Sequence, residues 1–315
     1  MPIATRTSPL ALAQAHDLQR RLAEAASAED AEAAFPILGM STTGDHITDR
    51  ALLAAGGKGL FTKELETALL AGTARFAVHS MKDVPTRLPD GLEIAAILER
   101  EDPRDVLLTA GEISRIEDLP EGAVLGTASI RRQAQALALR PDLKITLLRG
   151  NVDTRLGKVR SGEVDATFLA RAGLRRLGRA EAERTPLETS AILPAPAQGC
   201  VGVEIRTGDA EAQAILSKIN HAESQVRASA ERGFLEALDG SCRTPIAAHA
   251  VLNGAEIHLR GEALTPDGAK RWANETRATL PELDPAAAAA LGRELGLEVK
   301  RAGGETLARV VAETG

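Results

Sequence analysis

The sequence predicts an α/β protein with two similar lobes, followed by a smaller α+β domain. Short runs rich in branched apolar residues alternate with helical patterns up to about residue 218, where the texture changes. Strands that alternate with helices at this pitch indicate βαβ units and mainly parallel sheets. At 315 residues and 33.1 kDa, the chain is long enough for two or three domains with proper cores.

Four pairs of strand and helix support the two-lobe prediction. In chain order they are 2–6 with 8–25, 61–72 with 74–80, 122–129 with 130–139, and 151–162 with 164–170. The first and third pairs share Thr and Ser residues between strand and helix, in TRTSPLALAQA and GTASIRRQAQA. A duplicated lobe explains this echo, with a ligand bound between the lobes near the carboxyl ends of the strands. Two unrelated βα units are the alternative.

The C-terminal part predicts a small α+β domain. A helical stretch over 222–238 is followed by three strand-like runs, 245–252, 255–264 and 269–280. The turn signals NG and PDG separate these runs. A last helical pattern from residue 285 closes the chain.

Composition argues against nucleic-acid binding and membrane insertion. Hydrophobic residues make up 44% and charged residues 26% of the chain, so no long stretch is predicted to be disordered. Aromatic residues are only 2%, with no tyrosine, whereas single-stranded nucleic acids stack on aromatic faces. No apolar run approaches the roughly 18 residues of a membrane helix and no secretory signal pattern is present, so we expect a cytoplasmic protein.

Charge is unevenly distributed along the chain. The formal net charge is −6, yet residues 131–179 hold twelve Lys and Arg against four Asp and Glu. A basic middle in an acidic protein indicates a local anionic ligand. A solvated basic face is the alternative for a charge run taken alone.

The glycine-rich stretch GGKGLF first suggests a phosphate loop. It lacks the required pattern, because Leu52 and Gly59 stand where a P-loop needs glycine and Ser/Thr. Lys58 on this flexible turn is still a candidate anion contact, and an exposed lysine is the alternative.

The stretch AVHSMKDVPT ends an apolar strand in charged residues. Pro85 forces Val84 into an extended conformation, which places the Asp83 carboxylate at the end of the strand. Catalytic groups collect there in α/β lobes, although capping and turn roles also explain such aspartates. Strand alternation predicts that Lys82 and Asp83 point to opposite sides. His79 is expected to be packed or hydrogen-bonded, and no metal site is predicted.

Two further stretches, GTASIRRQ and LRGNVDTR, form an anion-handling set. A Gly-Thr-x-Ser turn that opens a helix offers backbone N–H groups, hydroxyls and the positive end of the helix dipole. Four arginines stand at predicted loop and helix starts: Arg131, Arg132, Arg149 and Arg155. Their guanidinium groups match carboxylates geometrically. So many positive charges would repel one another unless a ligand with several carboxylates or phosphates joined them.

The two cysteines, Cys200 and Cys242, belong to no metal or disulfide pattern, because they lack CxxC-type spacing. Cys242 lies in the loop DGSCRTPI at the entrance of the predicted third domain. It follows a predicted helix C-terminus, where the helix dipole disfavours a thiolate. Cys200 adjoins an apolar Val-Gly-Val run and is predicted to be a small buried residue.

Nine stretches together resemble the porphobilinogen deaminase family, also called hydroxymethylbilane synthase. They are TRTSPLALAQA, GGKGLFTKELE, AVHSMKDVPT, EREDPRDVL, GTASIRRQAQ, LRGNVDTRL, LARAGLRRLG, PAQGCVGVE and GSCRTPIAA. They follow the family's order from residue 5 to 248. Two departures are Ala197, in place of the first glycine of the usual GQG, and Ala54, where many relatives have a basic residue.

The resemblance implies a fold and an activity. Family members have two lobes like type II periplasmic binding proteins and a small third domain, here 1–98 with 198–218, then 99–197, then 219–315. They join four porphobilinogen molecules head to tail into hydroxymethylbilane and release ammonia. The growing chain is anchored on a dipyrromethane cofactor through a thioether to a loop cysteine, which is Cys242 here. A monomer that passes its product to uroporphyrinogen-III synthase is also implied.

The resemblance assigns site residues by position. Asp83 matches the catalytic aspartate. The cofactor-binding positions are Cys242, Lys82, Asp83, Ser129, Arg131, Arg132 and Arg149. The substrate-binding positions are Arg6, Ser8, Lys58, Arg149, Arg155, Arg176 and Gln198. Because each porphobilinogen carries an acetate and a propionate, a growing chain supplies the polyanion that the arginines require.

Two other classes of protein fit part of the pattern. A binding-only protein with two lobes explains the arginines and the duplication, but not a third domain that carries a thiol. A transcriptional regulator with the same ligand-binding core needs a helix-turn-helix, and the sequence offers none ahead of the first lobe.

Overall fold

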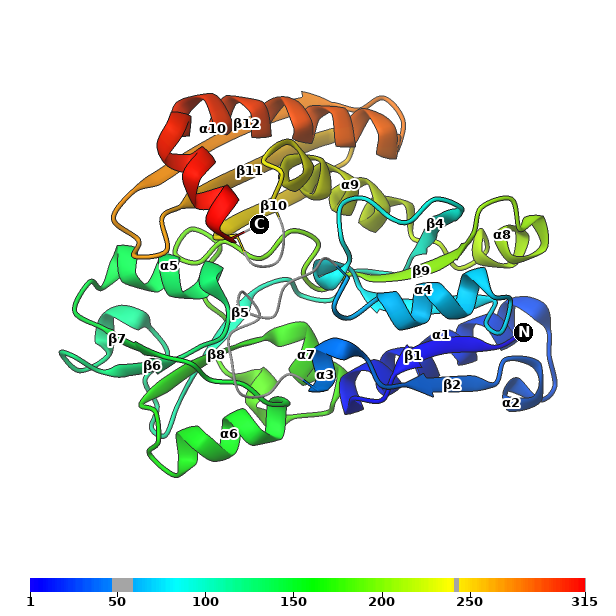
Figure 1. Cartoon of the computed structure of the whole chain (residues 1–315), viewed down its shortest axis with the longest axis horizontal. Coiled ribbons are helices and arrows are strands. Elements are labelled where there is room, and N and C mark those ends of the chain that lie inside the picture. The colour runs from blue at the N-terminus through cyan, green and yellow to red at the C-terminus, as the bar shows by residue number, and fades with distance from the viewer. Residues whose placement is uncertain (47–58, 241–243, 315) are drawn as a thin grey trace.

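The computed structural model describes residues 1–46, 59–240 and 244–314, and three sheets organise them (Figure 1). Two sheets belong to α/β lobes that lie side by side, and the third belongs to a C-terminal unit above them (Figure 1). The predicted fold class, two α/β lobes with a smaller α+β domain, is confirmed.

The first lobe has a five-stranded sheet in the order β2-β1-β3-β9-β4. Its strands are β1 (Ile3–Arg6), β2 (Ile37–Met40), β3 (Phe76–Ser80), β4 (Leu92–Ile97) and β9 (Val201–Arg206). Its helices are α1 (Pro9–Ala26), α2 (Ala31–Ala34), α3 (Thr43–His46), α4 (Lys63–Leu70) and α8 (Ala210–Leu216). Alternate strand residues face opposite sides, so Ile3 packs with Leu18 and Leu22 of α1, while Ala4 packs with Leu65 of α4.

The second lobe has a four-stranded sheet in the order β5-β8-β6-β7. Its strands are β5 (Asp105–Thr109), β6 (Val124–Gly126), β7 (Lys144–Thr146) and β8 (Ala166–Ala170). Its helices are α5 (Ile130–Leu139), α6 (Val152–Arg160) and α7 (Arg171–Arg176), with the 3-10 turns η3 (Ile116–Asp118) and η4 (Ala180–Glu183). The predicted helix 130–139 coincides with α5.

The second sheet repeats the topology of the first. Strands β6, β7 and β8 pair in parallel as β1, β2 and β3 do, and α5 follows β6 as α1 follows β1. In each lobe, a further strand pairs antiparallel with the last of these three strands: β9 pairs with β3, and β5 pairs with β8. Both β5 and β9 follow a passage of the chain from one lobe to the other. The prediction of mainly parallel sheets therefore holds for the repeated core. It fails at β4, β5 and β9, because the chain crosses between the lobes there.

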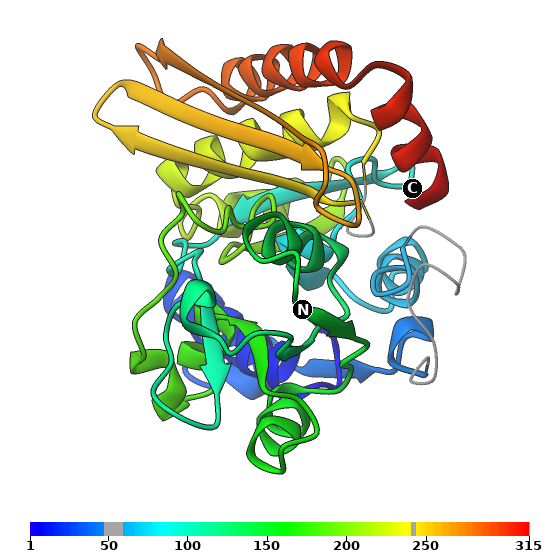
Figure 2. The ribbon, with the colours of Figure 1, turned by 90° about the vertical axis from the view of Figure 1, so that its left-hand side faces the viewer.

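The C-terminal unit combines α9 (Ala222–Ala237) with strands β10 (Ile246–Asn253), β11 (Glu256–Leu264) and β12 (Arg271–Thr279) and helix α10 (Pro285–Thr314). The strands form an antiparallel meander, and α9 and α10 pack on one face of it (Figure 2). Phe234 of α9 lies at the centre of this core, fully buried with Ile257 and Leu259. Helix α10 is kinked at Gly304, whose φ is 51°.

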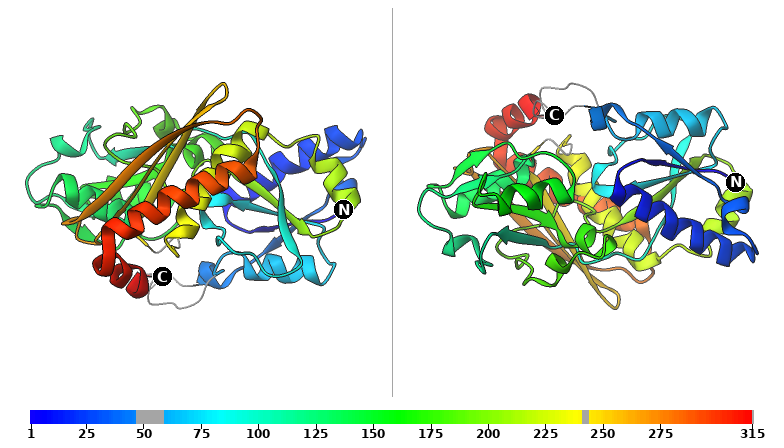
Figure 3. Two further views of the ribbon diagram at one scale, coloured as in Figure 1. Left: turned by 90° about the horizontal axis from the view of Figure 1, so that it is seen from above. Right: turned by 90° about the horizontal axis from the view of Figure 1, so that it is seen from below.

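The C-terminal unit contacts both lobes. Seen from above, α10 and the sheet beneath it lie across them (Figure 3). Helix α5 contacts β11, and α9 contacts β4. Gln133 of α5 donates a hydrogen bond to the carbonyl of Pro266 at 3.1 Å. The domain boundaries predicted at residues 98, 197 and 218 stay a prediction.

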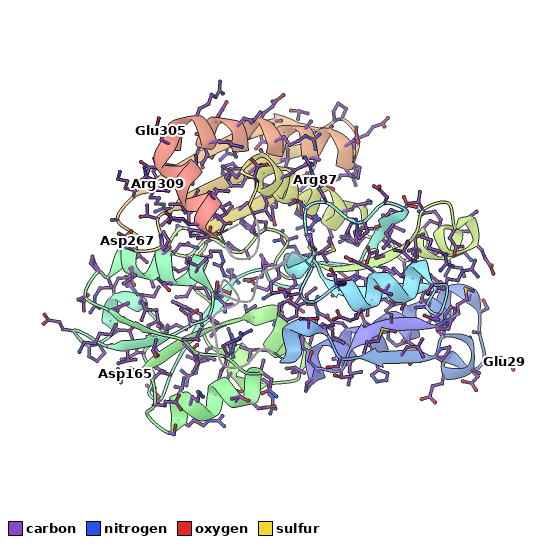
Figure 4. The ribbon with its side chains drawn as sticks, in the orientation of Figure 1. Glu29, Arg87, Asp165, Asp267, Glu305 and Arg309 are labelled. Carbon is purple, nitrogen blue, oxygen red and sulfur yellow. The ribbon has the colours of Figure 1, made fainter. Side chains whose placement is uncertain are left out.

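The outer surface carries charged side chains on all three parts, among them Glu29, Asp165 and Glu305, which are exposed (Figure 4). In the described ranges, no helix combines the length and apolar character that crossing a bilayer would require. The same residues contain no group of three or more His, Cys, Asp and Glu side chains that could hold a metal ion.

Candidate active site

A cavity of about 810 Å³ lies between the two lobes and reaches the C-terminal unit. It is lined by the ends of β3 and β8, the first turns of α1, α5 and α6, and residues near the start of β10. The predicted site residues that line it are Arg6, Ser8, Lys82, Asp83, Ser129, Arg131, Arg132, Arg149, Arg155 and Gln198. The fold thus brings predicted site residues that are as far apart in the chain as Arg6 and Gln198 to one cavity.

Three predicted site residues do not appear in that lining. Lys58 and Cys242 fall outside the residues that the structure describes. Thr244 and Ile246, just after the loop of Cys242, line the cavity. Arg176 lies at the lobe junction, where it donates a hydrogen bond to the carbonyl of Gly199 at 2.7 Å, and burial lowers its pKa.

Lys82 and Asp83 form a turn beyond β3. The strand ends at Ser80, and η2 (Met81–Asp83) is a single 3-10 turn closed by a hydrogen bond from the Val84 amide to the carbonyl of Met81. Val84 is extended, as its position before a proline predicts. The prediction that Lys82 and Asp83 point to opposite sides is wrong, since both line the cavity. The reason is that successive residues of a 3-10 turn do not alternate as in a strand.

The pKa of the Lys82 ammonium group is lower than that of an exposed lysine. Its pKa is lowered to about 8, chiefly by burial, and the charges of Arg132 and Arg131 contribute to this shift. Asp83 and Asp105 act in the opposite direction. A ligand carboxylate at Lys82 would therefore bind to an ammonium group whose charge the protein alone stabilises poorly.

Arg131 and Arg132 share one buried carboxylate, that of Asp105 at the start of β5. Arg131 donates to its Oδ2 at 2.8 Å, and Arg132 donates to Oδ1 at 2.8 Å and to Oδ2 at 3.2 Å. Arg131 also donates to the carbonyl of Leu193 at 2.7 Å, and Arg132 to that of Phe168 at 3.0 Å. The two guanidinium groups are thus held in place from behind by the protein.

Gln198 completes this network. Its side-chain Nε2 donates to Asp105 Oδ1 at 2.8 Å and to the carbonyl of Pro103 at 2.6 Å. Ser129 caps α5, and its hydroxyl accepts a hydrogen bond from the Arg132 amide at 3.4 Å. This cap fixes the start of the helix that presents the arginine pair.

The start of α6 adds two more arginines to the cavity wall, Arg149 and Arg155. Asn151 caps this helix by accepting from the Thr154 amide at 2.9 Å. Arg155 donates to the carbonyl of Gly150 at 2.9 Å. Burial lowers the pKa of Arg155 to about 10, and the charges of Arg132 and Arg149 contribute. Like charges are therefore close enough to destabilise one another.

The first lobe supplies the opposite wall. Ser8 caps α1 and accepts from the Ala11 amide at 3.3 Å. The Arg6 guanidinium lies 4.3 Å from the centre of the Phe61 ring, within cation–π range. Gln14 of α1 donates to the Ser80 hydroxyl at 2.9 Å, which ties the helix to the end of β3.

Two predictions about neighbouring residues are confirmed. His79 is buried, and its Nε2 lies 2.8 Å from Glu204 Oε2. Cys200 is a buried free thiol, and burial raises its pKa. The sequence does not reveal the roles of Gln14 and Asp105. Asp105 stands in the family-like stretch EREDPRDVL, but its arginine partners lie at least 26 residues away in the chain.

The cavity is suited to a ligand with many negative charges. Among the described residues of its lining, seven are Lys or Arg and only Asp83 and Asp153 are acidic. The lowered pKa values of Lys82 and Arg155 indicate that these cations lack sufficient counter-charge within the described chain. A linear set of carboxylates would supply it.

Comparison with known proteins identifies the family. The model described as "Porphobilinogen deaminase, dipyromethane cofactor binding domain" matches residues 1–214, and "Porphobilinogen deaminase, C-terminal domain" matches residues 225–301. The chain belongs to the porphobilinogen deaminase family. It is a transferase of tetrapyrrole biosynthesis, as the sequence predicts, with porphobilinogen as substrate and dipyrromethane as cofactor.

Named relatives match over almost the whole chain. The porphobilinogen deaminase of Caulobacter vibrioides is 51% identical over 312 residues, which is 97% of this chain and 96% of the relative. That of Phenylobacterium zucineum is 50% identical over 315 residues, 97% of each chain. Among solved structures, the periplasmic VFT2 domain of Bordetella pertussis BvgS has a TM-score of 0.41 at 16% identity, covering 70% of this chain and 86% of that one.

Proposed function

We propose that the cavity is the site at which four porphobilinogen molecules are condensed, with Asp83 as the catalytic carboxylate. The observation that carries this proposal is the position of Asp83 on the η2 turn, in a cavity whose charged lining residues are mostly basic. A carboxylate beside seven lysines and arginines is poorly suited to binding an anionic substrate. It is well suited to stabilising a positive charge that develops on that substrate.

The arginines bind and orient the substrate. Each porphobilinogen brings an acetate and a propionate, and forked guanidinium donors pair with such groups through two hydrogen bonds. Arg149 and Arg155 on the α6 side, and Arg6 with Ser8 on the α1 side, face one cavity. The bound side-chain carboxylates then fix the pyrrole ring relative to Asp83, which is a positioning effect.

Asp83 acts on the reacting ring. Loss of ammonia from porphobilinogen leaves a cation delocalised over the pyrrole, and an ionised carboxylate beside the ring N–H stabilises it. The same carboxylate can accept the proton that is released when the new ring regains aromaticity. Lys82, the neighbouring residue on the turn, pairs with a carboxylate of the substrate and does not act on the reacting ring.

The dipyrromethane cofactor fits the same cavity, because its own carboxylates would meet the excess of basic groups. When bound, it supplies the pyrrole on which the chain grows. The residues that would hold it are Lys82, Asp83, Ser129, Arg131, Arg132 and Arg149, with a thioether to Cys242. Thr244 lies at the cavity wall two residues after that cysteine, which supports the attachment.

Intact-protein mass spectrometry tests the assignment. The protein is expected to weigh two linked pyrrole units more than its sequence, and Cys242→Ser is expected to abolish this excess. Cys200→Ser is the matched control and should keep the excess, because the Cys200 thiol is buried. An active protein of unmodified mass would refute the proposal.

The setting of the enzyme is inferred from its family. We infer a cytoplasmic monomer that passes its product to a uroporphyrinogen-III synthase. We also infer that residues 1–98 with 198–218 form the first domain, 99–197 the second and 219–315 the third. The division of strands among the three sheets supports these boundaries.

A further inference from the structure

Arg232 of α9 reaches out of the C-terminal unit to the η2 turn. Its NH2 donates to the carbonyl of Pro85 at 2.6 Å, and its NH1 to those of Val84 at 2.9 Å and Met81 at 3.4 Å. Met81 begins the turn that presents Lys82 and Asp83, and Val84 and Pro85 follow it directly. One guanidinium group therefore binds the backbone of the turn and of the two residues that follow it.

Arg232 is half-buried, and its hydrogen-bond partners are backbone carbonyls. In the part of the chain that the structure describes, no carboxylate forms an ion pair with Arg232. Burial lowers its pKa to about 10, with only partial compensation from Glu236. A buried charge that lacks a counter-ion lowers stability unless its hydrogen bonds are satisfied. The carbonyls of the turn satisfy them here, so the turn and the guanidinium stabilise each other.

The geometry of the turn explains why it needs such a partner. The 3-10 segment spans only three residues, and the hydrogen bond that closes it, from the Val84 amide to the Met81 carbonyl, is long at 3.3 Å. The proline at position 85 has no N–H with which to extend the ladder. The carbonyls at the end of the turn would otherwise require water, and a fork of N–H donors can bind several at once.

Glu231, the residue before Arg232, binds Arg100 and Ala197, which lie where the chain passes between the two lobes. Glu231 is fully buried and accepts two hydrogen bonds from Arg100, at 2.6 and 3.0 Å. It also accepts from the amides of Ala197 and Ala250, at 2.6 and 2.7 Å. Glu231 thus connects the C-terminal unit to the residues between the two lobes, and Arg232 connects it to the η2 turn.

We propose that Arg232 is a positioning residue for the reaction: it holds the η2 turn, and so the Asp83 carboxylate, against the C-terminal unit. This inference rests on the proposed catalytic role of Asp83. Arg232 does not itself line the cavity, so its loss should affect turnover through the turn and leave substrate binding by the arginines largely intact.

Arg232→Gln tests the proposal in the cofactor-loaded enzyme, with Arg227→Gln as the control on the same helix. Arg227 contacts only Glu223 of its own helix in the hydrogen bonds and ion pairs of the described chain. The expected result for Arg232→Gln is a fall in kcat of about tenfold or more, because a shift of about 1 Å at a catalytic group has effects of this order. We expect KM to change by less than about threefold and the cofactor mass to be retained. Arg227→Gln should behave as the parent.

Hydrogen exchange gives a readout that a general loss of stability would not produce. The Val84 amide should exchange faster in Arg232→Gln, whereas amides within β3 should be unchanged. Arg232→Lys should recover part of kcat, since it keeps the charge but not the fork. If the Gln variant does not fold, Arg232→Lys alone should show the lower kcat with faster Val84 exchange.

Three outcomes would overturn the inference: an unchanged kcat, a rise in KM without a fall in kcat, or a uniform acceleration of exchange through β3. Asp83→Asn is measured in parallel to separate the two proposals. Normal turnover of Asp83→Asn would refute the proposed catalytic role of Asp83. If Asp83→Asn is inactive and Arg232→Gln has the parent kcat, only the positioning role of Arg232 is refuted.

Discussion

Arg132 binds Asp105 through both carboxylate oxygens, with N···O distances of 2.8 and 3.2 Å, and both side chains are buried. Arg131 donates to the same carboxylate at 2.8 Å. One negative charge therefore serves two adjacent guanidinium groups. The carboxylate fixes the arginines without fully neutralising them, which leaves positive charge for an anionic ligand in the cavity.

Asp105→Asn should destabilise the protein strongly. Removal of one partner from a buried ionic network leaves uncompensated charge, which costs about 3 kcal/mol or more. We expect a lower urea midpoint in the cofactor-free protein. The loss should be smaller in the loaded enzyme, where ligand carboxylates replace part of the missing charge.

Asp142→Asn is the control for this change, because Asp142 pairs with Arg140 in a more exposed position of the same lobe. Exposed pairs contribute little to stability. Equal midpoint shifts for the two variants would contradict the role assigned to Asp105.

The lowered pKa of Lys82 predicts a specific pH dependence of substrate use. Burial brings its pKa from 10.5 to about 8, so the lysine loses its charge in the free enzyme above pH 8. Bound carboxylates favour the charged form and raise this pKa, so substrate binding should take up a proton above pH 8. We expect kcat/KM for porphobilinogen to decline there.

Lys82→Arg provides the comparison, because a guanidinium stays charged over this range. Its kcat/KM should be lower at pH 7 but flatter between pH 7 and 9. The same decline in both enzymes would show that another group titrates.

Much of the fold and the anion-binding set could be predicted from the sequence, because the information is local. The helix 130–139, the Ser129 cap and the three C-terminal strands follow from periodicity and turn residues. The role of Asp105 could not be predicted, because its partners Arg131 and Gln198 are 26 and 93 residues away in the chain and only the folded structure brings them together. The orientation of Lys82 could not be predicted either, because the sequence pattern does not reveal that residues 81–83 form a 3-10 turn after the strand.

Gly199 should not tolerate a side chain. Its φ is 89°, and a Cβ there would lie 2.3 Å from the carbonyl oxygen of Glu101, at the lobe junction. Both the backbone strain and the contact with rigid backbone oppose the substitution. We expect Gly199→Ala to lower the free energy of unfolding by about 2 kcal/mol or more.

Gly178→Ala isolates the backbone part of that effect. Gly178 has a φ of 62°, and no described atom lies within 4 Å of the position that a Cβ would occupy, so its substitution should cost about 1 kcal/mol. Thermal unfolding of both variants decides the point. A cost for Gly199→Ala no greater than for Gly178→Ala would mean that the lobe junction adapts freely.

Asp83→Asn should preserve the fold and the cofactor while nearly abolishing turnover. The amide keeps the shape of the side chain but cannot carry the negative charge that stabilises a cation on the pyrrole. A loss of about 3 kcal/mol of transition-state stabilisation corresponds to roughly a 100-fold lower kcat. Steady-state kinetics with porphobilinogen measures this loss, and intact mass confirms the cofactor. Asp90→Asn, an exposed aspartate nearby in the chain, should keep the parent rate. If Asp83→Asn turned over normally, the carboxylate on the η2 turn would have no part in the chemistry, and the basic cavity alone would have to account for it.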